Sequence, residues 1–324
     1  MTHAEPSSAP RPRRRWLKIT LLTVMILVAV STALIGWWSY KARQQRAAVA
    51  AITTAGGQVS YTLPRGQAWL VNVLGNVHFA NVATVHLEGT RVTDADLEAL
   101  TVLTAPAAIY LGRTQVSDAG LERLQRITLL EVLFLDDTPV TDAGMNHIKG
   151  LKALKHLDLK GTKVTDAGLV HLKGLTALER IDFDNTKLTG AGLEHIKGLT
   201  ALAGLDLSGT LVTDADLEHL KGMAWLRGEL ILRGTPVTDA GLKHLSGLTA
   251  LQGLDLSSTQ VSDAGLVHLK GLTALTGLYL AFTNVTDAGL NHLKGLKSLR
   301  GLYLTGKVTD VGVWSAPQKL IQML

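Results

Sequence analysis

The sequence predicts an α/β solenoid: a horseshoe of short stacked units with a parallel sheet on its concave face, helices on its convex face, and one N-terminal transmembrane helix. Two observations support this fold class. From residue 83 onward the chain is self-similar at a period of 24 residues, through ten units. Ahead of the repeats, residues 19–38 contain no charged side chain. A leucine-rich period of 20–29 residues is typical of units that must stack to bury their apolar faces.

Residues 19–38 have the length and the flanks of a membrane-spanning helix. At 1.5 Å per residue such a segment covers roughly 30 Å, which matches the hydrocarbon core of a bilayer. Trp16 and Trp38 lie near its two ends, where interfacial aromatic residues gather. A cleaved signal peptide is the alternative, but its apolar core is shorter and its cleavage site contains small residues. We therefore expect a retained anchor.

The basic residues lie around this anchor and not in the repeats. The chain has a net charge of +5 and a pI of about 9.3. Residues 1–46 carry eight Lys and Arg against one acid, and the other 278 residues have a net charge of −2. The repeats thus lack the positive field that binds phosphates, and we expect no nucleic-acid partner. Five basic residues precede the span and three follow it, which favours a cytoplasmic N-terminus and periplasmic or extracellular repeats.

Each repeat unit combines a strand pattern with a helix pattern. Residues 155–178 read KHLDLKGTKVTDAGLVHLKGLTAL. Leu157 and Leu159 are expected to point into the core from a short strand, because side chains alternate between the two faces of a strand. Leu169 and Leu172 then follow at helical spacing and return the chain to the same core.

The turn between strand and helix is rich in hydroxyl and acidic residues. Thr162 and its equivalents are expected to form a ladder of hydroxyls that satisfy backbone groups. Thr165 is predicted to be a helix N-cap, and Asp166 lies at the positive end of the helix dipole. One unit has an extra residue before its strand, within residues 227–232, and we expect a local bulge near Gly228.

The predicted organisation has five parts, and both ends of the solenoid need caps. They are a basic disordered tail (1–18), the transmembrane anchor (19–38), a juxtamembrane helix with an N-terminal cap (39–82), the repeats (83–307) and a C-terminal cap (308–324). Within the N-terminal cap we expect a helix over 42–54, a turn at Gly56 and Gly57, a strand over 59–63 and a helix over 67–74.

The phrase Val-Thr-Asp-Ala-Gly-Leu after Leu-x-Leu-x-x-Thr resembles the leucine-rich-repeat subclass of F-box substrate adaptors. The equivalent unit there carries a Cys, and this chain has no cysteine. Over nearly its whole length the chain is similar to the membrane-anchored leucine-rich-repeat proteins of planctomycete bacteria. That similarity includes the segment 46–61, Trp69-Leu70 and Phe79–Val82. The resemblance implies a horseshoe fold and protein interaction in general, without naming a ligand.

One outward-facing residue of each strand is expected to lie on the concave sheet, where ligands of this architecture usually bind. Aromatic residues occupy this column toward its ends, and aspartates occupy its middle. The candidate ligand-binding residues are Tyr110, Phe134, Asp158, Asp182, Asp206, Asp255, Tyr279 and Tyr303. An acidic centre with aromatic anchors could take a basic or mixed-charge protein segment. Alternatively, the aspartates merely keep an exposed sheet soluble.

The sequence contains none of the sought enzyme signatures, such as G-x-S-x-G, H-E-x-x-H or a P-loop. We therefore expect no catalytic residue, no cofactor and no metal site, although neighbouring aspartates are the ligand type that calcium prefers. A histidine recurs in seven units, at positions 147, 171, 195, 219, 244, 268 and 292. This column is either a pH-sensitive or metal-binding ladder or one ancestral residue copied by duplication.

Together these features favour a non-enzymatic function. We expect a membrane-tethered protein-interaction scaffold or receptor ectodomain with an unknown ligand. The alternative is a structural envelope protein that associates with itself through its repeats.

Overall fold

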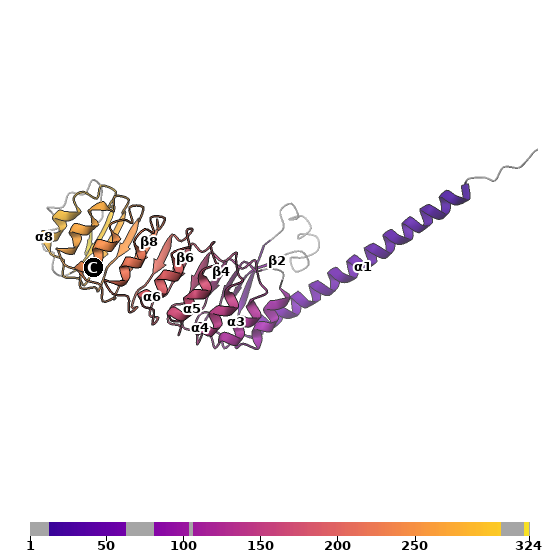
Figure 1. The fold of residues 1–324 in the computed structure, drawn as a ribbon. Helices are drawn as coiled ribbons and strands as arrows, with labels where there is room; N and C mark the ends of the chain where they lie inside the picture. The colour runs from indigo at the N-terminus through magenta and orange to yellow at the C-terminus, as the bar shows by residue number, and fades with distance from the viewer. Residues whose placement is uncertain (1–12, 63–80, 104–105, 306–320, 324) are drawn as a thin grey trace, which may run out of the picture.

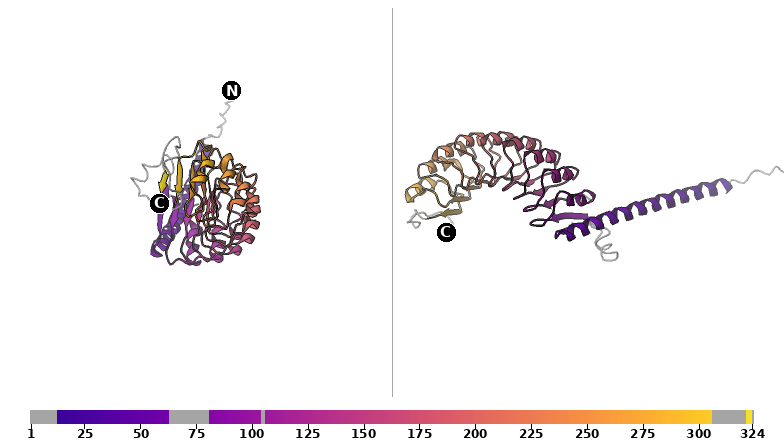
Figure 2. Two further views of the ribbon diagram at one scale, coloured as in Figure 1. Left: turned by 90° about the vertical axis from the view of Figure 1, so that its left-hand side faces the viewer. Right: turned by 90° about the horizontal axis from the view of Figure 1, so that it is seen from below.

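The protein is a curved solenoid attached to one long helix (Figure 1). The structure, a computed structural model, describes residues 13–62, 81–103, 106–305 and 321–323. In the right-hand view of Figure 2 the strands line the inside of an arch and the helices line its outside. The predicted horseshoe is confirmed. The expected cap helix over 67–74 and most of the expected tail and C-terminal cap lie outside the described residues.

One twelve-stranded sheet runs through the solenoid in chain order, from β1 to β12. The first pair, β1 and β2, is antiparallel, and every other pair is parallel. The strands are β1 (Gln58–Thr62), β2 (Asn81–His86), β3 (Ala108–Tyr110), β4 (Val132–Phe134), β5 (His156–Asp158), β6 (Arg180–Asp182), β7 (Gly204–Asp206), β8 (Glu229–Ile231), β9 (Gly253–Asp255), β10 (Gly277–Leu280), β11 (Gly301–Leu304) and β12 (Ile321–Met323).

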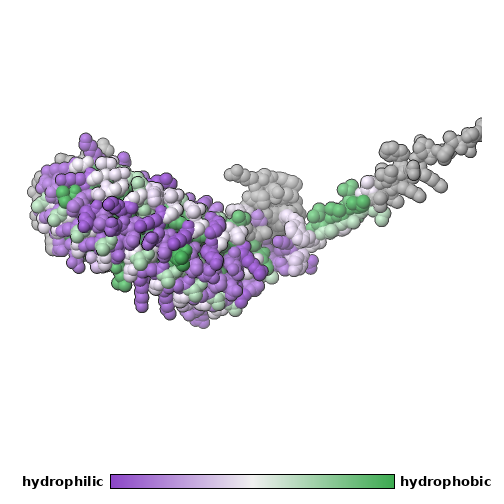
Figure 3. Space-filling model, viewed as in Figure 1, coloured by the Kyte–Doolittle hydropathy of each residue, from purple (hydrophilic) through white to green (hydrophobic). Residues whose placement is uncertain are grey.

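The helix α1 (Arg13–Thr54) joins the predicted span to the predicted cap helix without a break. Ala48 and Ile52, near its C-terminal end, are buried in the core of the first units. Its part Thr23–Thr54 is long and apolar enough to cross a membrane, and its length and composition also fit an N-terminal signal sequence. Figure 3 shows hydrophobic residues along the part of α1 that projects away from the repeats, whereas the visible side of the repeats is largely hydrophilic.

The convex segments are shorter and more tightly wound than full α-helices. Most begin as one or two α-turns and several continue as a 3₁₀ turn. The α-helical parts are α3 (Asp118–Leu124), α4 (Asp142–Ile148), α5 (Asp166–Leu169), α6 (Gly190–Leu193), α7 (Asp239–Leu242) and α8 (Asp287–Leu290). The 3₁₀ parts are η2 (Asp96–Val102), η3 (Val170–Leu172), η4 (Glu194–Ile196), η5 (Asp216–Leu220), η6 (Lys243–Leu245), η7 (Gly265–Gly271) and η8 (Asn291–Leu293).

The leucines of neighbouring units form one continuous core. Leu157, Leu159, Leu169 and Leu172 are at most 2 % exposed. Burying such a side chain contributes roughly 1.5–3 kcal/mol relative to leaving it in water. A single unit contains too few of these residues to hold its shape alone, so the fold depends on stacking.

The hydroxyl ladder is confirmed. The Thr162 hydroxyl is buried and donates to the carbonyl oxygen of Leu159 at 2.6 Å. The same contact recurs in the units with Thr114, Thr138, Thr186, Thr210, Thr235, Thr259 and Thr283. Each hydroxyl satisfies a carbonyl group at the end of its own strand, where the turn leaves the sheet.

The helix-start aspartates connect neighbouring units, which the sequence analysis did not foresee. Thr165 caps α5 as predicted, accepting from the Ala167 N–H. The carboxylate of Asp142, one unit earlier, accepts from both the Thr165 N–H and the Thr165 hydroxyl at 2.7 Å. Asp166 contacts Thr189 in the same way. Equivalent pairs join Asp94 to Ser117, Asp118 to Thr141, Asp214 to Thr238, Asp239 to Ser262 and Asp263 to Thr286.

The glycine of the Asp-Ala-Gly phrase makes room for this contact. A Cβ on Gly168 would lie 2.6 Å from a carboxylate oxygen of Asp142, and one on Gly192 would lie 2.6 Å from Asp166. Aspartate and glycine therefore recur together because each glycine faces the aspartate of the preceding unit.

The extra residue of the seventh unit lies in the turn before β8. The N–H groups of Gly228 and Glu229 both donate to the Ala203 carbonyl, and Leu205 pairs with Leu230 in register. The irregularity is thus absorbed at Arg227, and the ladder between β7 and β8 is only one pair shorter than that between β6 and β7.

Candidate functional site

The eight candidate residues lie in one row across neighbouring strands of the concave sheet. The register pairs Tyr110 with Phe134, Phe134 with Asp158, Asp158 with Asp182, and Asp182 with Asp206. Ile231 interrupts the row between Asp206 and Asp255, and Tyr279 and Tyr303 follow. All of these side chains are half-buried. Because the sequence period sets the register, the structure brings together the residues that the sequence analysis selected.

Aromatic rings are stacked at the N-terminal end of the row. His86 and Tyr110 stack with ring centroids 4.7 Å apart and planes at 5°. Tyr110 meets Phe134 edge to face at 4.9 Å and 71°. Such ring pairs are favourable beyond their buried area, so this end presents a pre-ordered apolar surface.

The four aspartates have a structural role that the sequence analysis missed. Each uses one carboxylate oxygen to accept a hydrogen bond from the backbone N–H two residues later. The distances are 2.9 Å for Asp158 with Lys160, 2.7 Å for Asp182 with Asp184, 2.8 Å for Asp206 with Ser208 and 2.7 Å for Asp255 with Ser257. Aspartate is well suited to such turns because its short side chain can bond to nearby backbone groups. These carboxylates therefore have fixed orientations.

The middle of the row is an unfavourable environment for negative charge. Burial raises the pKa of Asp158 to about 6, and the charges of Asp136 and Asp206 add to that effect. Burial also raises the pKa of Asp182 to about 7, with further contributions from Asp206, Asp158 and Asp184. Neighbouring carboxylates that share a partly buried surface favour a cation or a proton between them.

The flanking outward positions add charges of both signs. The ammonium of Lys160 lies 2.7 Å from a carboxylate oxygen of Asp184. The guanidinium of Arg180 lies 3.9 Å from Glu229, and both side chains are more than half exposed. Between these two residues is a depression of about 60 Å³, also lined by Asp182, Gly204 and Asp206.

A second stacked pair closes the C-terminal end of the row. The rings of Tyr279 and Tyr303 are parallel, with centroids 4.3 Å apart and planes at 3°. Each ring leans back along its own strand. The Tyr279 ring lies 3.6 Å from where a Cβ on Gly277 would be, and the Tyr303 ring lies 3.2 Å from that position on Gly301.

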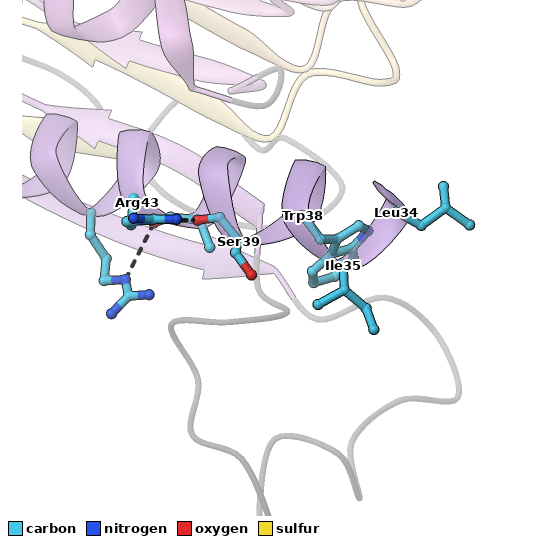
Figure 4. Close-up of a pocket in the computed structure, with 7 residues that line it drawn as sticks. Leu34, Ile35, Trp38, Ser39 and Arg43 are labelled. Atoms are coloured by element: carbon cyan, nitrogen blue, oxygen red, sulfur yellow. Dashed lines mark hydrogen bonds between the residues drawn. The ribbon is translucent and has the colours of Figure 1, made fainter. Parts of the chain in front are cut away.

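A larger hollow of about 560 Å³ runs along α1 (Figure 4). It is lined by Leu34, Ile35, Trp38, Ser39, Ala42, Arg43 and Arg46. The Arg43 Nε donates to the Ser39 carbonyl on the same helix. All of these residues lie along one helix, so they do not converge as the polar groups of a small-molecule site do. We therefore place the candidate site on the concave sheet.

The convex histidines are not gathered into a site. His147, His171 and His195 each lie on a different unit, at the outer side of the solenoid. Within the described parts of the chain, no group of three His, Asp or Glu residues could hold a metal ion.

One repeat of the chain matches a known family. Residues 151–172 match a leucine-rich-repeat family model. No curated protein matches the chain. Among solved structures, an internalin (inlF) from Listeria monocytogenes is 18 % identical, covers 75 % of this chain and 88 % of its own, and has a TM-score of 0.47. Internalin C2 (inlC2) from the same species is 22 % identical, with coverages of 77 % and 87 % and a TM-score of 0.34.

The matched unit contains β5 and α5, and its strand, turn and helix positions recur along the described solenoid. The chain is thus a solenoid of similar units, one of which matches the leucine-rich-repeat model.

Proposed function

We propose that the chain is a membrane-tethered interaction scaffold or receptor ectodomain whose concave sheet binds a segment of a partner protein. The supporting observation is the row from Tyr110 to Tyr303, which changes from aromatic to acidic and back to aromatic. The buried positions of the units repeat almost unchanged, whereas this row does not. Ile231 and the aromatic residues show that the fold tolerates other side chains here. Its pattern is therefore better explained by a ligand than by folding.

The proposed contact residues are those predicted from the sequence: Tyr110, Phe134, Asp158, Asp182, Asp206, Asp255, Tyr279 and Tyr303. Stacked aromatic rings supply large contact area at low entropic cost, as in other protein interfaces. The acidic centre supplies charge complementarity, which steers encounter and selects partners.

The tether is the second part of the proposal. We propose that residues 19–38 remain in the membrane, with the N-terminus in the cytoplasm and the repeats outside it. A span within α1 would continue directly into the first unit, because Ala48 and Ile52 are buried in the core. The repeats would then be held at the membrane surface by a stiff connection.

The absence of cysteine from the sequence allows a clean test of this orientation. Single cysteines are introduced by Ser7→Cys in the tail and by Thr200→Cys on the exposed surface of the repeats. A membrane-impermeant maleimide should label the Thr200→Cys variant outside the sealed cytoplasmic membrane, and the Ser7→Cys variant only after that membrane is opened. The reverse pattern, or release of the repeats from the membrane fraction by cleavage, contradicts the proposal.

The binding surface is tested by charge reversal. The triple variant Asp158→Lys, Asp182→Lys, Asp206→Lys should lose the crosslinked partners of the wild-type protein in cells. The matched control is Glu122→Lys, Glu194→Lys, Glu218→Lys on the convex side, which reverses the same charge elsewhere. Equal loss in both variants would indicate a general charge effect and contradict concave binding. A detergent-solubilised chain that forms large homo-oligomers would favour the structural envelope protein instead.

A further inference from the structure

We propose that an arginine side chain of the partner binds against the ring of Tyr279, between the carboxylates of Glu229 and Asp255. This inference rests on the proposed function, because it assumes that the concave face binds a protein segment. It adds the location of one contact and the chemistry of the residue that makes it. The slot involves three adjacent strands, β8, β9 and β10.

The ring of Tyr279 has one face that can accept a cation. Tyr303 of β11 stacks on one side of it at 4.3 Å, with the planes 3° apart. Because the stack runs from β10 to β11, the opposite face of Tyr279 is directed toward β9. The ring leans over Gly277, which pairs with Gly253 of β9. This second face therefore lies beside the backbone of Gly253.

The Glu229 side chain approaches the backbone of Gly253 from β8, on the side opposite Tyr279. Glu229 pairs with Gly253 in the sheet, and its Cγ lies 2.8 Å from where a Cβ on Gly253 would be. Any larger residue at position 253 would push this side chain away. Glycine thus allows Glu229 to lie across β9 toward Tyr279.

Asp255 completes the slot on β9 itself. It pairs directly with Tyr279, and its hydrogen bond from the Ser257 N–H at 2.7 Å fixes its carboxylate. Burial raises the pKa of Tyr279, and the charges of Tyr303, Glu229 and Asp255 act in the same direction. Two carboxylates and an aromatic face are thus concentrated within one strand spacing on either side of β9, about 4.8 Å.

The chain already directs one guanidinium toward this slot. Arg180 of β6 crosses Gly204, whose Cβ would lie 3.2 Å from the Arg180 Nε, and ends 3.9 Å from Glu229. The ion pair is long and its side chains are well exposed, so it is weak. A partner arginine could contact Glu229 and stack on Tyr279 at the same time, and this additional contact would let it displace Arg180 from Glu229.

Arginine fits better than lysine for two reasons. Its planar guanidinium can stack on a ring, and its fork of N–H groups can contact two carboxylates at once. A cation over an aromatic face is attracted by the negative charge density of the ring. The repeats have a net charge of −2 outside the anchor region, so a basic segment meets no long-range repulsion.

The test uses the full chain in nanodiscs of zwitterionic phosphatidylcholine, so that the lipid does not attract the probe. The probe is a fluorescent nine-residue Gly/Ser peptide with three arginines, compared by anisotropy with matched lysine and citrulline peptides. We expect the arginine peptide to bind about tenfold more tightly than the neutral citrulline peptide, since one such contact is worth about 1.4 kcal/mol. The lysine peptide should fall between them.

The variants locate the contact. Glu229→Gln and Tyr279→Leu should each weaken arginine-peptide binding about fivefold. Glu194→Gln removes a charge from the exposed convex side and should leave it unchanged. Arg180→Gln should strengthen binding about twofold, because the internal competitor is removed. No purely structural role of Arg180 predicts this gain.

The inference is overturned by equal binding of the arginine and citrulline peptides, or by Glu229→Gln behaving like Glu194→Gln. Weaker binding by Arg180→Gln would also contradict it. These variants could leave arginine-peptide binding unchanged while the charge-reversed concave variant still loses its cellular partners. That result would support the scaffold function and contradict the arginine slot. Thermal unfolding of each variant verifies that the fold is kept.

Discussion

The carboxylate of Asp216 accepts hydrogen bonds from both the backbone N–H and the hydroxyl of Thr213, each at 2.8 Å. In most units the equivalent Thr or Ser is bonded by a carboxylate of the preceding unit, but the corresponding position before Thr213 is Gly190. A Cβ on Gly190 would collide with the Asp216 carboxylate. Asp216 also stands where most other units have glycine. Thr93 of the first unit is likewise bonded within its own unit, by Asp96. In each of these units one carboxylate therefore bonds to the Thr or Ser at the turn, and it comes from one of two mutually exclusive positions.

This relationship predicts that the two residues can be exchanged. Asp216→Gly should destabilise the repeat domain by about 1–3 kcal/mol, because it leaves the Thr213 N–H without its acceptor. Gly190→Asp alone should also destabilise it, since two carboxylates would compete for one space. The double variant Gly190→Asp, Asp216→Gly should recover most of the loss, as measured by chemical denaturation. Additive losses in the double variant would contradict this exchange of carboxylate positions.

The glycine of the Asp-Ala-Gly phrase should tolerate no side chain. Gly168→Ala places a methyl group against Asp142 and should cost about 1–3 kcal/mol through overpacking. Gly198→Ala is the matched control, because nothing lies within 4 Å of a Cβ at that position. The difference in melting temperature between the two variants measures the effect. Equal melting temperatures would show that Gly168 has no role in spacing the units.

The central aspartates should make the repeats less stable as the pH rises from 4 to 8. The pKa of Asp158 is raised to about 6 and that of Asp182 to about 7 from a usual value of 3.8. The folded chain therefore keeps protons that the unfolded chain releases in this window, and stability is lost as they dissociate. Asp182→Asn keeps an acceptor for the Asp184 N–H and should flatten the pH dependence of the melting temperature. An unchanged pH profile would contradict the raised pKa of Asp182.

Replacing Phe282 with glycine should stabilise the repeat domain. This residue has a positive φ of 58° and is 71 % exposed, so it adopts a left-handed conformation with little burial in return. Phe282→Gly should raise stability by about 1 kcal/mol, whereas Phe282→Ala keeps the unfavourable Cβ and should change it little. Denaturation midpoints compare the two. If the glycine and alanine variants were both less stable than the wild-type protein by the same amount, the ring of Phe282 itself would stabilise the fold.

The stacked fold and the concave row could be predicted because they depend on periodicity. Leucines such as Leu157 and Leu159 recur at fixed positions, and parallel stacking then places Asp158 beside Asp182 without further information. The charge-free segment 19–38 likewise predicts a helix from composition alone, and it lies within α1.

The contacts between units could not be predicted, because a residue that recurs in every unit can have its role within its own unit or in a contact with the next one. Asp166 recurs like a simple helix-start residue, and only the structure shows its carboxylate on Thr189. In the sequence, Gly190 takes the place of the usual aspartate, and Asp216 in the next unit takes the place of the usual glycine. This double change indicates an exchanged contact only once the structure shows which atoms of the two units face each other. The hydrogen bonds of the concave aspartates depend on turn geometry in the same way.

Site-specific photo-crosslinking in cells tests the central claim most directly. A photoreactive residue is placed at position 182 on the concave sheet or at the exposed position 194 on the convex side, with the tether intact. We predict that position 182 gives a discrete crosslink to a partner protein and that position 194 gives none. Adding Asp158→Lys and Asp206→Lys to the position 182 variant should abolish its crosslink. The same crosslinks from both positions, or crosslinks only from position 194, would contradict a binding function of the concave face.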